Sequence, residues 1–261
     1  MRTLSELLPF LNQLGRRPNR ALSQSFLVDP NIVRKIVDLA VVRDGDSVFE
    51  IGPGAGALTS ELMQRGAKLI AVEKDPVLAV ALQARGVRLF SCDILDFDWQ
   101  MLHSQAPFKV VANLPYHITT PILELLLQHK SLFSSFTIMV QEEVALRMMA
   151  RPGSSDYGAL SLFMQFHTEL IDSFLVSPSC FYPRPKIFSR VLHFLPKKSP
   201  LSEAALSTIR RTFQTRRKML RTSLKDLLSQ EEIEKGLLAA GASPQARPEE
   251  LSLEQWCEFF S

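Results

Sequence analysis

Short apolar runs alternate with segments of helical periodicity over the first three quarters of the chain. The runs that predict strands cover 47–51, 68–72, 87–91, 110–112 and 136–140. Segments with apolar side chains at helical spacing lie between or beside them, including 30–39, 119–127, 141–149 and 159–166. This alternation is typical of an α/β fold with a doubly wound, mostly parallel sheet, which binds ligands at the carboxyl ends of its strands. Two further runs, 171–176 and 189–194, predict a closing antiparallel pair.

Strand signals stop after Pro200, where leucine and other apolar residues recur at helical spacing from Leu206 to Leu227. A last apolar segment, 251–260, predicts a terminal helix. We therefore expect two domains, a Rossmann-like domain over 1–196 and a small all-helical domain over 197–261. The chain of 261 residues is long enough for both.

The N-terminal segment predicts a helix rather than a signal peptide, because Glu6, Asn12 and Gln13 interrupt its leucines. No apolar run is long enough to span a bilayer. The three cysteines are scattered and show no metal-ligand spacing, so we expect no disulfide framework and no metal site. These features favour a cytoplasmic protein without a membrane partner.

Basic residues are concentrated in one block of a chain whose net charge is only +3. Residues 197–225 contain nine basic side chains and one acidic side chain, whereas 226–261 contain two basic and eight acidic ones. Arg210, Arg217, Arg221 and Lys225 recur on one face of the predicted 206–227 helix, which is the pattern of a phosphate-binding stripe. A solvated helix face is the alternative interpretation.

A glycine-rich turn, Gly52-Pro53-Gly54-Ala55-Gly56, joins the predicted 47–51 strand to a helix. Glycines at Gly52 and Gly54 allow backbone N–H groups to approach a nucleotide-like ligand. Glu73 ends the second strand, where a carboxylate can accept both hydroxyls of a ribose, and Asp93 ends the third, where it can accept from an adenine amine. A solvated surface role is the alternative for Glu73.

The segment Asn113-Leu114-Pro115-Tyr116 follows the fourth strand. It combines an amide, a carbonyl beside a rigid proline and an aromatic ring, which together suit adenine, since two acceptors can hold the exocyclic amine while a ring stacks on the base. Phe181, in the proline-rich loop 181–186, is a candidate for the second stacking ring. A plain turn at Asn113 and a buried Phe181 are the structural alternatives.

These motifs resemble those of the ribosomal RNA adenine N6-dimethyltransferases, and most closely the small-subunit (16S) branch. The resemblance covers nearly the whole chain and includes 24–27, 50–56, Glu73, Asp93, 113–116, 181–186 and 213–218. It implies that S-adenosylmethionine is the cofactor and that Ser25, Leu27, Gly52, Glu73, Asp93 and Asn113 line its site. The family usually has asparagine at the position of Ser25. Lys218 joins the predicted RNA-binding residues through the 213–218 motif.

The resemblance also implies the reaction, dimethylation of N6 in two adjacent adenosines of a hairpin loop near the 3′ end of 16S rRNA. The Asn113 oxygen and the Leu114 carbonyl would accept the N6–H groups, and Tyr116 and Phe181 would hold the base. We expect a monomer that acts on small-subunit rRNA or a 30S precursor particle and contributes to ribosome biogenesis.

The sequence is also compatible with three other functions. Antibiotic-resistance methyltransferases of large-subunit rRNA share the catalytic motif. A non-catalytic ribosome assembly factor would keep the fold and bind RNA without transferring methyl groups. A nicotinamide-dependent oxidoreductase fits Gly52, Gly54, Ala57 and Glu73, but it leaves Asn113 to Tyr116 without a role and lacks an evident general acid.

Overall fold

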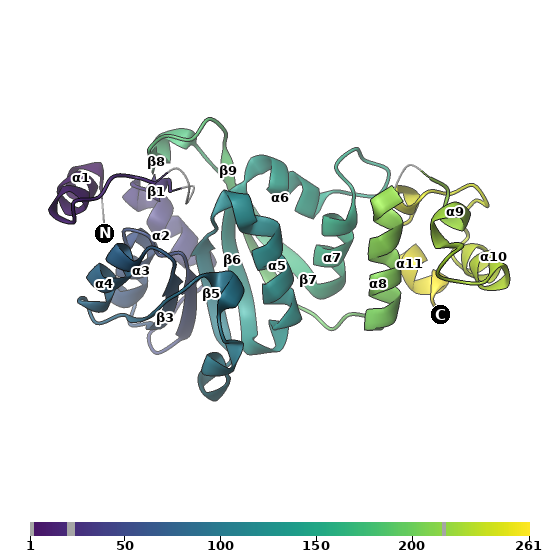
Figure 1. The fold of residues 1–261 in the computed structure, drawn as a ribbon, viewed down its shortest axis with the longest axis horizontal. Helices are drawn as coiled ribbons and strands as arrows, with labels where there is room; N and C mark the ends of the chain where they lie inside the picture. Colours follow the sequence, from purple (N-terminus) through teal and green to yellow (C-terminus); the bar gives the residue numbers. More distant parts are fainter. Residues whose placement is uncertain (1–2, 20–23, 216–217) are drawn as a thin grey trace. The chain divides into compact units, whose positions relative to one another are not determined.

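The computed structural model describes residues 3–19, 24–215 and 218–261, which form two compact units (Figure 1). The first unit comprises Met1–Glu142 and Leu170–Pro196, and the second comprises Glu143–Glu169 and Lys197–Ser261. This division differs from the single break that the sequence predicts at residue 196. Residues 143–169 join the C-terminal segment because their apolar side chains, among them Tyr157 and Phe166, share its core.

A seven-stranded sheet in the order β4-β3-β2-β5-β6-β9-β7 forms the centre of the fold. Its strands are β2 (Ser47–Ile51), β3 (Lys68–Glu73), β4 (Arg88–Ser91), β5 (Phe108–Asn113), β6 (Phe133–Gln141), β7 (Thr168–Val176) and β9 (Ser189–Pro196). Strands β2 to β6 pair in parallel, and β9 is antiparallel to β6. The structure therefore confirms the predicted doubly wound sheet with an antiparallel closing strand. A separate pair, β1 (Phe26–Leu27) with β8 (Phe181–Tyr182), is also antiparallel.

The central strands are apolar along their length because helices cover both faces of a parallel sheet. In β2, for example, Val48, Phe49 and Ile51 are all almost completely buried. The helices of this unit are α1 (Leu4–Gln13), α2 (Pro30–Leu39), α3 (Ala57–Gln64), α4 (Pro76–Gln83) and α5 (Thr119–Gln128). Both α2 and α4 start with an aspartate N-cap followed by proline, a combination that satisfies the first helical N–H groups and sets the backbone angle.

The second unit is helical and has its own core. Its helices are α6 (Glu142–Met149), whose first residue belongs to the first unit, α7 (Ala159–His167), α8 (Glu203–Thr212), α9 (Leu220–Leu224), α10 (Gln230–Ala239) and α11 (Leu253–Phe259). Tyr157 and Trp256 are completely buried in this core, and the Tyr157 hydroxyl donates to the Leu251 carbonyl at 3.0 Å. That hydrogen bond joins the two chain segments of the unit.

The prediction of one continuous helix over 206–227 is wrong. Helix α8 ends at Thr212, a 3₁₀ turn covers Phe213–Thr215, and α9 begins only at Leu220. The Leu220 N–H donates to the Ala246 carbonyl at 2.8 Å instead of continuing a helical ladder. Arg210 therefore lies on α8 and Arg221 on α9, whereas Lys218 precedes α9 and Lys225 follows it, so these side chains do not share one helix face.

Candidate active site

The glycine turn lies at the point where the sheet changes direction. From β2 the chain proceeds to β3 and β4 on one side, and it then returns to β5 on the other side. Ligands of doubly wound sheets bind outside the carboxyl ends of the strands at such a switch point. Here Gly52, Gly54 and Gly56 all have positive φ, at 65°, 57° and 81°, and a Cβ on Gly54 would lie 3.2 Å from the Phe26 ring. At Gly52 and Gly54 the backbone therefore lines the neighbouring cavity without a side chain in front of it.

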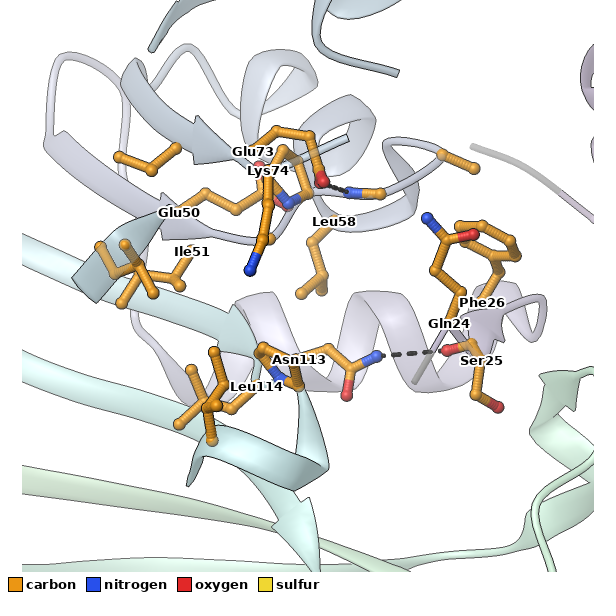
Figure 2. Close-up of a pocket in the computed structure, with 18 of the residues that line it drawn as sticks. Gln24, Ser25, Phe26, Glu50, Ile51, Leu58, Glu73, Lys74, Asn113 and Leu114 are labelled. Carbon is orange, nitrogen blue, oxygen red and sulfur yellow. Dashed lines mark hydrogen bonds between the residues drawn. The ribbon is translucent and has the colours of Figure 1, made fainter. Parts of the chain in front are cut away.

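Glu73 closes this turn from the end of β3. Its carboxylate accepts the Gly54 N–H at 2.9 Å through one oxygen (Figure 2). Its other oxygen accepts the Asp75 N–H at 2.8 Å. Burial raises the pKa of Glu73, and the two backbone donors offset part of that rise. Each carboxylate oxygen has two lone pairs, so the group can still accept from a ligand in the cavity.

Asp93 follows β4 and is held by an ion pair with Lys74. The Lys74 ammonium lies 2.7 Å from one carboxylate oxygen, and the Leu95 N–H donates to the other at 3.0 Å. Partial burial acts to raise the pKa of Asp93, but the Lys74 hydrogen bond and the Leu95 N–H together lower it. Asp93 is therefore an ionised acceptor on the cavity wall.

Asn113 is the last residue of β5, and its side chain points into the cavity (Figure 2). Its amide nitrogen donates weakly to the Ser25 carbonyl at 3.5 Å. Its buried Oδ1 has no hydrogen-bond partner among the residues that the structure describes. A buried acceptor without a partner is costly, so this oxygen is the atom of the site best suited to receive a donor from a ligand.

The rest of the predicted tetrapeptide surrounds Asn113. Leu114 is buried, and its N–H donates to the Met139 carbonyl at 3.1 Å, which fixes the backbone to β6. Pro115 and Tyr116 also line the cavity. The Tyr116 hydroxyl is 2.6 Å from the Ser189 hydroxyl, and burial raises the pKa of Tyr116. The ring is thereby held in one position.

The β1–β8 pair brings the Ser25 segment next to the proline-rich loop, with Phe26 opposite Tyr182 and Leu27 opposite Phe181. Ser25 and Leu27 line the cavity, but the Ser25 hydroxyl donates to the Pro183 carbonyl at 2.7 Å. For Phe181 the structure supports the alternative of a buried ring rather than a second stacking ring in the cavity. Phe181 is 4% exposed, packs in the core of the first unit, and is not among the residues that line the cavity.

The cavity encloses about 1040 Å³, its open mouth included. It brings together the predicted residues Ser25, Leu27, Gly52, Gly54, Glu73, Asp93, Asn113, Leu114, Pro115 and Tyr116. Their chemistry fits S-adenosylmethionine, because a bare glycine backbone, two strand-end carboxylates and an unpartnered amide oxygen face one cavity. Among the described residues, no group of three or more potential metal ligands is close enough to hold a metal ion.

Glu50 is a further cavity residue that was not among the predicted ones. Glu50 lines the cavity at the end of β2, is 1% exposed, and accepts the Thr59 hydroxyl at 2.7 Å. Burial raises the pKa of Glu50 to about 8, and the Thr59 hydrogen bond offsets part of the rise. A lone carboxylate inside an otherwise apolar strand is the signal that could have identified it.

The predicted RNA-binding residues lie in the second unit. Arg210, Lys218, Arg221 and Lys225 are exposed, and the Arg210 guanidinium lies 4.7 Å from the centroid of the Phe163 ring. Arg217 lies outside the described residues. No helix in the described part of the chain is long and apolar enough to cross a bilayer.

The fold and the site together define a Rossmann-like, S-adenosylmethionine-dependent methyltransferase. The chain matches the ribosomal RNA adenine dimethylase family over residues 15–261, and it belongs to that family. It is 45% identical to the ribosomal RNA small subunit methyltransferase A of Protochlamydia amoebophila, over 98% of this chain and 95% of that protein. Identity to the protein of the same name from Chlamydia abortus is 41%, with the same coverage.

Solved structures show the same fold. A dimethyladenosine transferase from Plasmodium falciparum has a TM-score of 0.74 at 24% identity, over 90% of this chain and 95% of that one. The 23S rRNA methyltransferase ErmE has a TM-score of 0.67 at 26% identity, over 90% and 98%.

Proposed function

We propose that this protein transfers methyl groups from S-adenosylmethionine to N6 of two adjacent adenosines in a hairpin loop near the 3′ end of small-subunit rRNA, giving N6-dimethyladenosines. The relatives named small subunit methyltransferase A, which match almost the full chain, support the choice of RNA. The observation that carries the chemistry is the buried Asn113 oxygen without a partner at the end of β5.

Adenine N6 is a poor nucleophile because its lone pair is delocalised into the ring. In our proposal the Asn113 Oδ1 and the Leu114 carbonyl each accept one N6–H, which favours a pyramidal nitrogen with a localised lone pair. Tyr116 stacks on the base, whereas Phe181, buried in the core, takes no part in holding it. The proton leaves to solvent after methyl transfer.

S-adenosylmethionine supplies the methyl group from a positively charged sulfur, so no further activation of the donor is needed. We assign its ribose to Glu73, its adenine amine to Asp93, and its remaining polar groups to the backbone of Gly52 and Gly54. Ser25 and Leu27 form the opposite wall. The side-chain hydroxyl of Ser25 bonds to Pro183, so the Ser25 backbone is the group that we expect to face the cofactor.

A base in this cavity must first leave its stack, which favours an adenosine in a loop over one in a duplex. We propose that basic side chains of the second unit bind the phosphates on either side of this base. They are Arg210, Arg217, Lys218, Arg221 and Lys225. The first unit would then carry the transfer and the second unit the rRNA contacts. The setting we propose is the cytoplasm, with a monomer acting on a precursor of the small subunit during its assembly.

Primer extension on rRNA from cells with and without this protein tests the target. The proposal expects a stop at the adjacent small-subunit adenosines only when the protein is present. In vitro transfer of tritiated methyl groups to 30S precursor particles, with large-subunit rRNA as the matched control, tests the same point in isolation. Labelling of the large-subunit control instead would favour the alternative function, for which the likeness to the 23S rRNA methyltransferase is the specific observation.

A further inference from the structure

Phe188 has the most exposed aromatic ring among the described phenylalanine, tyrosine and tryptophan residues. Its exposed fraction is 46%, and every other phenylalanine, tyrosine and tryptophan that the structure describes is buried or half-buried. Its neighbour Ile187 is 41% exposed. Two adjacent exposed apolar side chains, one of them aromatic, make this short segment a candidate for contact with a ligand.

The backbone holds Phe188 at a fixed place. The Glu142 N–H donates to the Phe188 carbonyl at 3.0 Å. Two residues further on, Arg190 forms a two-point contact with the Glu142 carboxylate, with N–O distances of 2.9 and 3.0 Å. A ring on such a rigid base loses little conformational freedom when it stacks on a ligand.

Phe188 lies close to residues of the active site. Ser189, the next residue, begins β9 opposite Gln141, the last residue of β6, and Asn113 at the end of β5 pairs with Met139 of the same strand. The Ser189 hydroxyl also contacts the Tyr116 hydroxyl at 2.6 Å. Phe188 therefore lies at the same edge of the sheet as Asn113 and Tyr116, the edge formed by the carboxyl ends of the parallel strands.

The loop that leads to Phe188 is basic, and the nearby Glu142 carboxylate is paired with Arg190. Arg184 and Lys186 are exposed in the same loop, and no acidic residue occurs between Ser173 and Ser202 in the sequence. An exposed ring beside cations is the combination that binds single-stranded nucleic acid, where bases stack on aromatic faces and phosphates contact basic side chains. A surface for another copy of the chain would not need the two cations.

We propose that Phe188 forms a stacking site for a nucleotide next to the target adenosine, with Arg184 and Lys186 on the adjoining phosphates. The inference rests on the proposed function, because it takes single-stranded RNA as the substrate. Flipping the target base out of its stack leaves the neighbouring base with one uncovered face. Phe188 covers that face and holds the RNA strand open at the mouth of the cavity.

The test uses the full chain and an RNA hairpin whose loop carries the two adenosines, with 2-aminopurine placed on each side of them in turn. Wild-type protein should quench the 2-aminopurine on one side, and Phe188→Ala should remove that quenching. Phe188→Ala should weaken RNA binding by roughly 5- to 150-fold, while Phe188→Tyr restores it. The KM for RNA should rise accordingly, with kcat and the affinity for S-adenosylhomocysteine unchanged.

Val80→Ala is the matched control, because Val80 is 63% exposed on α4 and lies outside the cavity. An abasic nucleotide at the quenched position should weaken wild-type binding as much as Phe188→Ala does, and combining the two should cost nothing more. The proposal is overturned if Phe188→Ala binds the hairpin like wild type, or if it loses the same factor again on the abasic RNA. It is also overturned if the substitution instead dissociates a dimer in sedimentation, which would make the segment around Phe188 a protein interface. Failure of the proposed function would show differently, as absence of methyl transfer by the wild-type protein.

Discussion

The Glu73 carboxylate accepts the Gly54 N–H at 2.9 Å, which fastens the end of β3 to the glycine turn that follows β2. Its other oxygen accepts the Asp75 N–H, so one side chain fixes two neighbouring loops of the cavity. The geometry of the turn therefore depends on an acceptor at residue 73.

Glu73→Gln should weaken cofactor binding by about tenfold or more. The glutamine side chain must present an NH₂ group to one of two backbone donors, and each hydrogen bond to a charged acceptor contributes roughly 1.5–3 kcal/mol. Calorimetric titration with S-adenosylhomocysteine measures the loss. Glu61→Gln is the control, since Glu61 is a buried carboxylate on α3 that does not line the cavity. Equal affinities in the two variants would contradict the assignment.

Gly56→Ala should destabilise the protein more than Gly86→Ala. Both glycines have positive φ, at 81° and 84°, so alanine costs roughly 1–2 kcal/mol of backbone strain at either position. At Gly56 the new Cβ would also lie 2.7 Å from Cδ2 of the buried Leu82, and overpacking adds about 1–3 kcal/mol, whereas nothing lies within 4 Å at Gly86. Urea unfolding of both variants measures the difference. Identical losses would show that the turn accommodates the methyl group.

Glu50 should make stability depend on pH. Its pKa is about 8 in the folded protein and its ordinary value is 4.5, so the stability contributed by the neutral carboxyl is complete below 4.5 and is lost as pH rises to about 8. Glu50→Gln stays neutral and lacks this loss. Its free energy of unfolding, relative to that of the wild type, should therefore increase between about pH 5 and about pH 8. A constant difference across this range would contradict the raised pKa.

Asn113→Ala should reduce kcat for methyl transfer by at least about a hundredfold, because it removes a polar group aimed at the reacting nitrogen. Cofactor affinity should change little, since the hydrogen bond from Asn113 to Ser25 is long. A tritiated-methyl assay beside calorimetry separates the two effects. Asn113→Asp keeps an acceptor oxygen and should recover part of the rate. Near-normal turnover of Asn113→Ala would refute the mechanism.

Charge reversal at Arg221 and Lys225 should weaken RNA binding and flatten its salt dependence. Each lost phosphate contact reduces the slope of log affinity against log salt by roughly 0.7 for single strands and 0.9 for duplexes. Filter binding across a salt series gives the slope. Lys235→Glu on α10 is the control, because it changes an exposed cation of the same unit outside the basic block. If RNA affinity and its salt dependence change equally in all three variants, the effect reflects net charge only.

The sheet was predictable because its strands are buried on both faces and so appear as unbroken apolar runs. The cavity residues were predictable for a related reason, since each follows a strand whose carboxyl end the topology brings to one edge. Glu73, Asp93 and Asn113 were found in this way. The hydrogen bond from Gly54 to Glu73 was not, because it depends on side-chain conformation.

The failed predictions depend on contacts between distant segments. The helix break before Leu220 is stabilised by the Ala246 carbonyl, and the burial of Phe181 follows its pairing with Leu27. Neither contact leaves a local pattern in the sequence. The membership of 143–169 in the second unit likewise depends on a partner such as Leu251, far along the chain.

That second unit is built from two separated stretches, and this arrangement constrains its synthesis. A nascent chain delivers Tyr157 and Phe166 long before Leu251 and Trp256, with which they share one core. Until Leu251 and Trp256 have been synthesised, the core around these rings is incomplete. Chains that stop before Leu251 should therefore have an incomplete second core and expose Tyr157 and Phe166, even though every residue of the methyl-transfer cavity has already been made.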